Sequence, residues 1–232
     1  MYNNNEYDEL LFCDAPPLSI AKYLQNKGEM FSDTFENAIN VKLLDGAEPE
    51  MHLFGFVDES MASNVRESLK FLKMKGSPTV RVNITSDGGF VRSGMGIHDQ
   101  LLLYPGGALG VVCEYVSSAA IQLLLQGCIQ RSATANTEFF CHYCQGIMRV
   151  NARILRKDKA RMLMIEEYEK INNKMVRILM DRTMRSEKEI RRMLTRERVM
   201  SAEEALEFGL IDQIIPLTMI RRPRTQKAPS PQ

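Results

Sequence analysis

Through the middle of the chain, short apolar or β-branched segments alternate with amphipathic helical segments, and this alternation constrains the fold more than any other feature. Residues 79–85 show the period-two pattern of a strand, whereas residues 60–74 place Val65, Leu69 and Leu72 near one face of a helix. Strands and helices that alternate in this way predict an α/β domain built on a largely parallel sheet.

The same reading divides the whole chain. We expect an N-terminal extension over residues 1–50, one domain over 51–216 and a disordered tail over 217–232. The expected strands of the domain are 51–56, 79–85, 109–113, 131–135, 138–142 and 211–215. The expected helices are 60–74, 91–103, 117–126, 151–182, 186–194 and 202–208.

Charge and hydropathy exclude several classes of protein. The 30 Lys and Arg nearly cancel the 29 Asp and Glu, so no bulk charge attracts nucleic acid. No run of 18 apolar residues predicts a membrane span, and the polar, acidic start of the chain is unlike a secretory signal. The five cysteines, an odd number, argue against a disulfide framework, so we expect a reducing, cytoplasmic location.

A Gly-Gly pair, Gly88-Gly89, follows an expected strand directly and precedes an expected helix. Glycine at such a junction allows positive φ and leaves backbone N–H groups open, so the pair can stabilise an oxyanion or bind a phosphate. The spacing of known nucleotide motifs is missing, which makes phosphate the weaker reading. Alone, a Gly-Gly pair is more often a simple turn.

Ser117-Ser118 opens an expected helix after a buried strand. A serine in this position is commonly an N-cap. It can also be a nucleophile whose developing oxyanion lies near the free N–H groups at the start of the helix. The small Ala119 and Ala120 that follow would let a substrate carbonyl approach.

His142 closes an expected strand and is one of only three histidines, so it is a candidate general base. The neighbouring Cys141 and Cys144 also suggest a metal site, but a single Cys-x-x-Cys without a second pair is a weak signal, and we expect no metal. Gly-Gly, Ser and His together make a serine hydrolase plausible, and a triad also needs a carboxylate to hold the imidazole tautomer, for which spacing alone offers many candidates.

Six ordered blocks of the sequence resemble ClpP, the family of proteolytic subunits of the ATP-dependent Clp protease. They cover about two-thirds of the chain, between residues 51 and 215. The blocks are 52–62 (HLFGFVDESMA), 84–91 (ITSDGGFV), 93–99 (SGMGIHD), 113–127 (CEYVSSAAIQLLLQG), 136–142 (NTEFFCH) and 201–212 (SAEEALEFGLID).

The resemblance implies a ClpP/crotonase-like fold, a repeated β-β-α spiral with a long protruding handle helix. It implies Ser118 as nucleophile and His142 as general base, with Glu197 at the position of the orienting carboxylate, where the family usually has Asp. It also implies an oxyanion hole formed by Gly89 or Gly88 and by Ala119. The flank 113–120 departs from the family pattern, because its glycines are lost and Glu114 adds a charge.

The resemblance further implies heptameric rings that stack into a tetradecamer, an AAA+ unfoldase of the Clp type as partner and unfolded polypeptides as substrates. No cofactor is implied, because ATP would be used only by the unfoldase. Residues 151–182 would be the handle between rings, with Met162, Met164, Met175 and Met180 as interface residues. The other reading is an amphipathic helix packed on its own sheet.

Two other functions remain open. The chain could be a catalytically weak or inactive Clp-like subunit that builds a mixed ring, which the altered flank and Glu197 favour. It could also be an acyl-CoA enzyme of the crotonase type, although that class explains neither the Ser and His in register nor the 201–212 block.

Overall fold

The computed structural model describes residues 41–42, 48–145 and 158–216. The predictions for the N-terminal extension, except at its last few residues, and for the tail lie outside these ranges. So does the first part of the expected long helix. The boundaries of the three expected regions therefore stay predictions.

The described strands and helices follow the expected alternation. The strands are β1 (Val41–Lys42), β2 (Glu50–Val57), β3 (Val80–Gly89), β4 (Ala108–Val112), β5 (Tyr115–Ser117), β6 (Gln130–Thr134), β7 (Glu138–Phe140), β8 (Val199–Met200) and β9 (Gln213–Ile215). The helices are α2 (Glu59–Met74), α3 (Val91–Leu102), the π-helical turn η4 (Ala120–Leu124), the 3-10 turn η5 (Leu125–Gly127), α5 (Asp158–Thr183), α6 (Glu187–Arg196) and α7 (Ala202–Phe208).

The long strand β3 belongs to two sheets. Its first half pairs with β4, which continues through β6 to β9, while its last residues pair with β5, which continues through β7 to β8. β2 lies along the other side of β3. Every pairing is parallel except β1 with β2 and β7 with β8. The structure thus confirms the largely parallel sheet that the alternation predicts.

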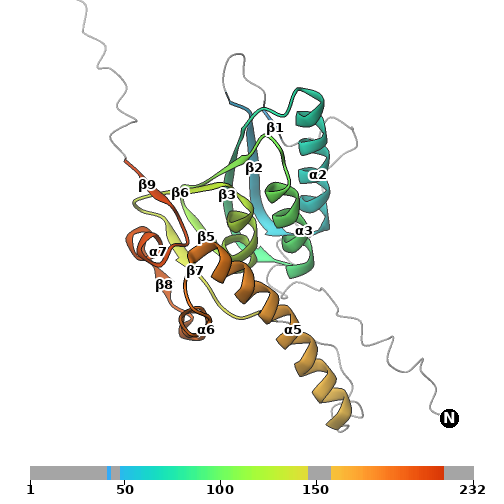
Figure 1. Cartoon of the computed structure of the whole chain (residues 1–232), viewed down its shortest axis with the longest axis vertical. Coiled ribbons are helices and arrows are strands. Elements are labelled where there is room, and N and C mark those ends of the chain that lie inside the picture. The colour runs from blue at the N-terminus through green and yellow to red at the C-terminus, as the bar shows by residue number, and fades with distance from the viewer. Residues whose placement is uncertain (1–40, 43–47, 146–157, 217–232) are drawn as a thin grey trace, which may run out of the picture.

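Helices cover the sheet with their apolar faces. α2 and α3 pack side by side (Figure 1), and the α2 residues turned inward are Met61, Ala62, Val65, Leu69 and Leu72. α2 begins where Asp58 Oδ1 accepts the Met61 N–H at 2.8 Å, a side-chain N-cap. No helix in the described ranges is both long enough and apolar enough to cross a membrane.

The Ser-Ala-x-Glu start of the last block is a capping box. Ser201 Oγ accepts the N–H of Glu204, and the Glu204 carboxylate accepts the N–H of Ser201. These two bonds satisfy N–H groups that the first turn of α7 would otherwise leave unpaired. Glu204 also accepts two hydrogen bonds from Arg198, at 2.8 and 3.0 Å, which ties the cap to the preceding strand.

The region around residue 118 differs from the expected single strand and helix. The chain bends at the exposed residues Cys113 and Glu114, forms the extra strand β5, and then turns at Ser118 into η4 rather than into a regular α-helix. β7 also ends earlier than expected, at Phe140, so that His142 lies in the loop beyond the strand. β5 pairs with β3, and β7 pairs with β5 and β8. Both differences thus involve long-range pairings that local sequence patterns do not encode.

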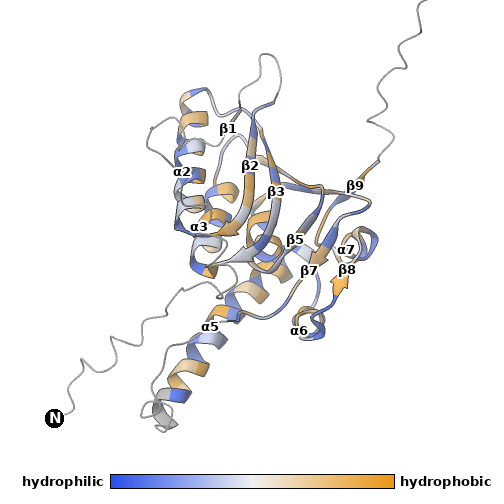
Figure 2. Cartoon of the chain, turned by 180° about the vertical axis from the view of Figure 1, so that it is seen from behind, coloured by the Kyte–Doolittle hydropathy of each residue, from blue (hydrophilic) through white to orange (hydrophobic). Residues whose placement is uncertain are grey.

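α5 projects away from the body of the molecule (Figure 1) and mixes hydrophobic and hydrophilic residues along its outer half (Figure 2). Of the four methionines expected at an interface, Met175 is buried and Met180 packs against the core, which fits the alternative reading for that half of the helix. Met162 lies on the projecting half and is 64% exposed, near the exposed Ile165.

An ion pair between a buried arginine and a partly exposed aspartate joins β6 to the segment before β9. Arg131 is almost fully buried, and its guanidinium donates to both carboxylate oxygens of Asp212, at 2.5 and 3.1 Å. The remaining donors of the guanidinium reach Gln126 Oε1 and the Gly209 carbonyl. Burial alone would raise the pKa of Asp212, but the hydrogen bonds and charge of Arg131 outweigh it and hold that pKa below its ordinary value.

We expect Asp212→Asn to lower the free energy of unfolding by about 2 kcal/mol, because it leaves a buried arginine without its counter-charge. The loss is smaller than for a fully buried pair, since the Asp212 side chain is 39% exposed and water screens it. A depressed carboxyl pKa adds stability above the pKa of the unfolded state, about 3.9, and this stability is lost as the pH falls through the folded value. Urea unfolding between pH 3 and 7 should show this acid-dependent part in the parent and not in the variant. The exposed Asp181, mutated to Asn, serves as control, and an equal effect there would contradict the assignment.

Candidate active site

Three adjacent parallel strands bring the candidate residues to one edge of the smaller sheet. Ser86 of β3 pairs with Val116 of β5, and Val116 pairs in turn with Phe139 of β7. Gly88, Ser118 and His142 follow these paired positions by two or three residues. The carboxyl ends of parallel strands are where α/β proteins commonly place their ligands. The register therefore gathers the three sequence-predicted segments on one side.

Ser118 occupies a sharp turn between β5 and η4. Its φ of 51° lies in the left-handed region, which costs a non-glycine residue about 1–3 kcal/mol. Strain of this kind holds the nucleophile of many hydrolases at the tip of a strand–helix turn. Ala119 follows in the first helical turn, where a backbone N–H has no acceptor within the helix. The π-helical turn that comes next is also a form that frequently occurs at functional sites.

Gly88 lies directly against this turn. A methyl group on Gly88 would stand 2.6 Å from Ser118 Cβ and 2.9 Å from the Ala119 nitrogen, so only glycine fits. The Gly88 N–H donates to Ser86 Oγ at 3.0 Å, and Ser86 is fully buried. Gly89 instead packs against the backbone of Val57 on β2. The Gly88 N–H is thus already engaged, which leaves Gly89 as the stronger of the two oxyanion candidates.

His142 is half-buried and its ring has a defined hydrogen bond. Nδ1 lies 2.7 Å from the Tyr143 carbonyl oxygen, and the ring packs on Phe140 with centroids 5.4 Å apart. A carbonyl oxygen can only accept, so in the neutral imidazole this hydrogen bond places the proton on Nδ1 and the lone pair on Nε2. Within the described part of the chain no hydrogen bond joins His142 to Ser118 or to Glu197.

Glu197 ends α6 in the left-handed conformation, with φ 45° and ψ 48°, and its side chain is exposed. β7 and β8 are antiparallel, with Phe140 opposite Val199. Continued by two residues, this register carries Glu197 toward His142. The topology therefore brings Glu197 to the same edge, but the described residues show no hydrogen bond or ion pair between its carboxylate and the imidazole, and its orienting role stays a prediction.

The hydrogen bonds around His142 include two side chains that the sequence analysis did not single out. Gln122 Nε2 donates to the His142 carbonyl at 2.8 Å, and Asn172 Oδ1 accepts the Cys144 N–H at 2.8 Å. Gln122 could have been noticed in the sequence, because it is a polar residue within an apolar run. Asn172 gave no such indication, since it lies on a different, largely polar helix.

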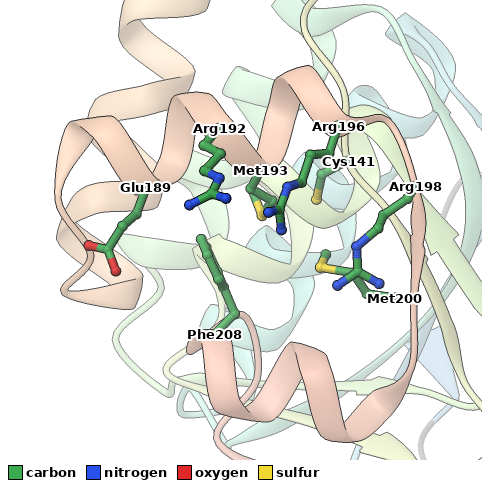
Figure 3. A pocket seen from close by; sticks show the side chains of 8 residues that line it. All are labelled: Cys141, Glu189, Arg192, Met193, Arg196, Arg198, Met200 and Phe208. Atoms are coloured by element: carbon green, nitrogen blue, oxygen red, sulfur yellow. The ribbon is translucent and has the colours of Figure 1, made fainter.

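Two hollows flank this edge. An open groove of about 500 Å³ between α5 and α6 is lined by Tyr143, Glu169, Asn172, Asn173 and Arg191. A second hollow of about 180 Å³ lies between α6, β8 and α7. Arg192, Arg196 and Arg198 line it together with Phe208 and Met200; Arg192 lies nearest the Phe208 ring and Arg198 lies beside Met200 (Figure 3). Neither Ser118 nor His142 lines the arginine-rich hollow, so the candidate catalytic residues lie outside it.

Two cysteines near the site, Cys141 and Cys144, have pKa values raised by burial. Burial raises the pKa of Cys141 to about 12. Neither is therefore a thiolate near neutral pH, as a nucleophilic cysteine would need to be. In the described ranges no three His, Cys, Asp or Glu side chains gather as a metal site would require.

The fold and this edge define an α/β protein whose parallel strands deliver a Gly-Gly loop, a serine on a strained turn and a histidine to one place. The model of the Clp protease family matches residues 36–218, and the chain belongs to this family. The fold is similar to that of a point mutant of ClpP1 from Listeria monocytogenes, with a TM-score of 0.62 and 21% identity over 72% of this chain and 90% of that one. The ClpP/crotonase-like fold and the family resemblance are thereby confirmed.

Proposed function

We propose that this protein is a Clp-like serine endopeptidase that hydrolyses peptide bonds of unfolded polypeptides inside an oligomeric chamber. The observation that carries the proposal is the convergence of Gly88, Ser118 and His142 at one sheet edge, with Ser118 on a strained turn against Gly88. Membership of a family of serine peptidases supports the same chemistry.

Each residue has a role in this mechanism. Ser118 Oγ attacks the peptide carbonyl, while His142 Nε2 accepts the hydroxyl proton and later gives it to the leaving amine. The N–H groups of Gly89 and Ala119 stabilise the oxyanion, each by about 3 kcal/mol. Substrate binding would bring Ser118 and His142 into hydrogen-bond contact, as catalytic hydrogen bonds are often long before the substrate binds. No step of this mechanism needs a cofactor.

The proposed assembly follows the family: heptameric rings, stacked into a tetradecamer, that receive polypeptide from an AAA+ unfoldase of the Clp type in the cytoplasm. The projecting half of α5 supports self-association. Met162, Leu163 and Ile165 expose apolar surface there, and an exposed apolar patch on a protruding helix is typical of an interface.

We expect Ile165→Glu combined with Met162→Glu to shift the assembly toward smaller species by at least about tenfold in the dissociation constant, because each buries a charge at the contact. Native mass spectrometry measures the distribution. Met74→Glu, at a methionine on α2 that is 79% exposed, is the matched control. An unchanged distribution in the double variant would place the interface elsewhere.

The proposed activity is tested by labelling the assembled protein with a fluorophosphonate probe while measuring cleavage of a fluorogenic peptide. Labelling at Ser118 together with peptide turnover supports an active peptidase. A ring that forms, neither labels nor cleaves, and still binds an active Clp subunit would instead identify the inactive structural subunit. That second function is favoured by the altered flank 113–120 and Glu197, and by the lack of a hydrogen bond between Ser118 and His142 in the described structure. No observation favours the acyl-CoA enzyme.

A further inference from the structure

The Tyr143–Cys144 peptide unit lies between the candidate base and helix α5. Its carbonyl oxygen is 2.7 Å from His142 Nδ1, and its N–H donates to Asn172 Oδ1 at 2.8 Å. In a trans peptide the C=O and N–H point in opposite directions, so one rigid plane links the two side chains. Fixing the N–H on Asn172 therefore also fixes the direction of the carbonyl toward the imidazole.

The peptide unit before it is also anchored. The His142 carbonyl accepts a hydrogen bond from Gln122 Nε2 at 2.8 Å. Gln122 is 1% exposed and lies in η4, the turn that immediately follows the nucleophile. The Tyr143 hydroxyl reaches the Arg191 carbonyl of α6 at 3.3 Å. Three elements thus hold the loop of residues 142–144.

We propose that this anchored peptide unit performs the orienting role that serine peptidases usually give to a carboxylate, with Asn172 as a positioning residue. The inference rests on the proposed peptidase function. The Tyr143 carbonyl keeps the proton on Nδ1 and so keeps the Nε2 lone pair available to take the proton of Ser118. The hydrogen bond from Cys144 N–H to Asn172 polarises the same peptide and strengthens the carbonyl as an acceptor.

Glu197 is dispensable under this proposal. Its side chain is exposed and the described structure shows no hydrogen bond or ion pair between it and His142. The sequence-based expectation is the opposite, namely that Glu197 orients His142 and that its loss lowers turnover by orders of magnitude. The two views give results that differ widely.

The kinetic test uses the full-length assembled protein, a fluorogenic peptide and four variants. We expect Glu197→Gln to keep kcat within about threefold of the parent and to leave the acid limb of the pH–rate profile in place. Asn172→Ala should lower kcat at least about tenfold with little change in KM, because a loosened base affects the chemical step. Asn172→Asp, which still offers an acceptor to the Cys144 N–H, should retain most of the activity.

The control is Asn173→Ala, on the neighbouring residue of α5. Its Oδ1 accepts from the Arg191 guanidinium rather than from a backbone N–H of the 142–144 loop, so kcat should stay close to that of the parent. A loss of at least about 100-fold in Glu197→Gln, with Asn172→Ala no worse than Asn173→Ala, would overturn the proposal and assign the role to Glu197.

A second measurement separates this proposal from the peptidase function. Solid-state ¹⁵N spectra of the sedimented, histidine-labelled protein, with His142 assigned by His142→Gln, report which ring nitrogen carries the proton. We expect Nδ1–H in the parent and in Glu197→Gln, and a mixture of tautomers in Asn172→Ala. Nδ1–H in a protein that neither labels nor cleaves would refute the peptidase function alone. Nε2–H in the parent would refute the orienting role whatever the activity.

Discussion

Ser118→Ala should lower peptide turnover by at least about 10³-fold and abolish labelling by the fluorophosphonate probe, because the nucleophile of a covalent mechanism is then missing. Alanine keeps the Cβ, so the left-handed backbone at residue 118 is no more strained than in the parent. The variant should therefore fold and assemble normally. Turnover of the fluorogenic peptide and probe labelling on the same sample measure the effect.

Ser117→Ala is the matched control. Ser117 is the last residue of β5, pairs with Phe140 and precedes the strained turn. If the sequence alignment had slipped by one residue, this variant rather than Ser118→Ala would lose its activity. Activity within about twofold of the parent in Ser118→Ala would refute the proposed nucleophile, since loss of a true one costs orders of magnitude.

Gly88→Ala should lower turnover by at least about 100-fold, because the added methyl group collides with the nucleophile turn and displaces it from the oxyanion donors. The methyl carbon would stand 2.6 Å from Ser118 Cβ, and the φ of Gly88 is +91°. Overpacking and the left-handed backbone together should also lower the free energy of unfolding by about 2–4 kcal/mol. Urea unfolding and peptide cleavage separate the two effects.

Gly55→Ala distinguishes the collision from the backbone penalty. Gly55 has a similar φ of +87°, but a methyl group there meets no atom within 4 Å. The variant should lose only about 1 kcal/mol of stability and keep its turnover. Equal losses of turnover in both variants would mean that the close approach of Gly88 to Ser118 has no catalytic importance.

The sequence predicted most of the fold because periodicity and turn chemistry are local signals. The helix over residues 202–208 occurs with the expected bounds, since Ser201 and Glu204 form its capping box. Strand β5 was missed because the bend at Glu114 and the pairing with β3 depend on residues distant in the chain. The end of β7 at Phe140 rather than His142 depends likewise on distant residues, because β7 pairs with β5 and β8.

The candidate site was predictable only in part. Gly88, Ser118 and His142 could be recognised by their residue type and their positions at the ends of expected strands. The strand register brings their segments together. The acceptor next to His142 is a backbone carbonyl, whose direction no side-chain pattern encodes. It depends on Asn172, which is far from His142 in the sequence and comes close only through packing of α5.

Because β3 pairs with strands of two sheets, the two sheets have backbone ladders of very different length. The smaller sheet contains strands of only three, three and two residues beside the end of β3, whereas the larger one has the long β2–β3 ladder; both sheets contribute buried side chains to one core. Short ladders open locally at a lower free energy than the core that supports them. Packing of Val116 and Phe139 in the common core therefore opposes local opening at the edge that carries Ser118 and His142.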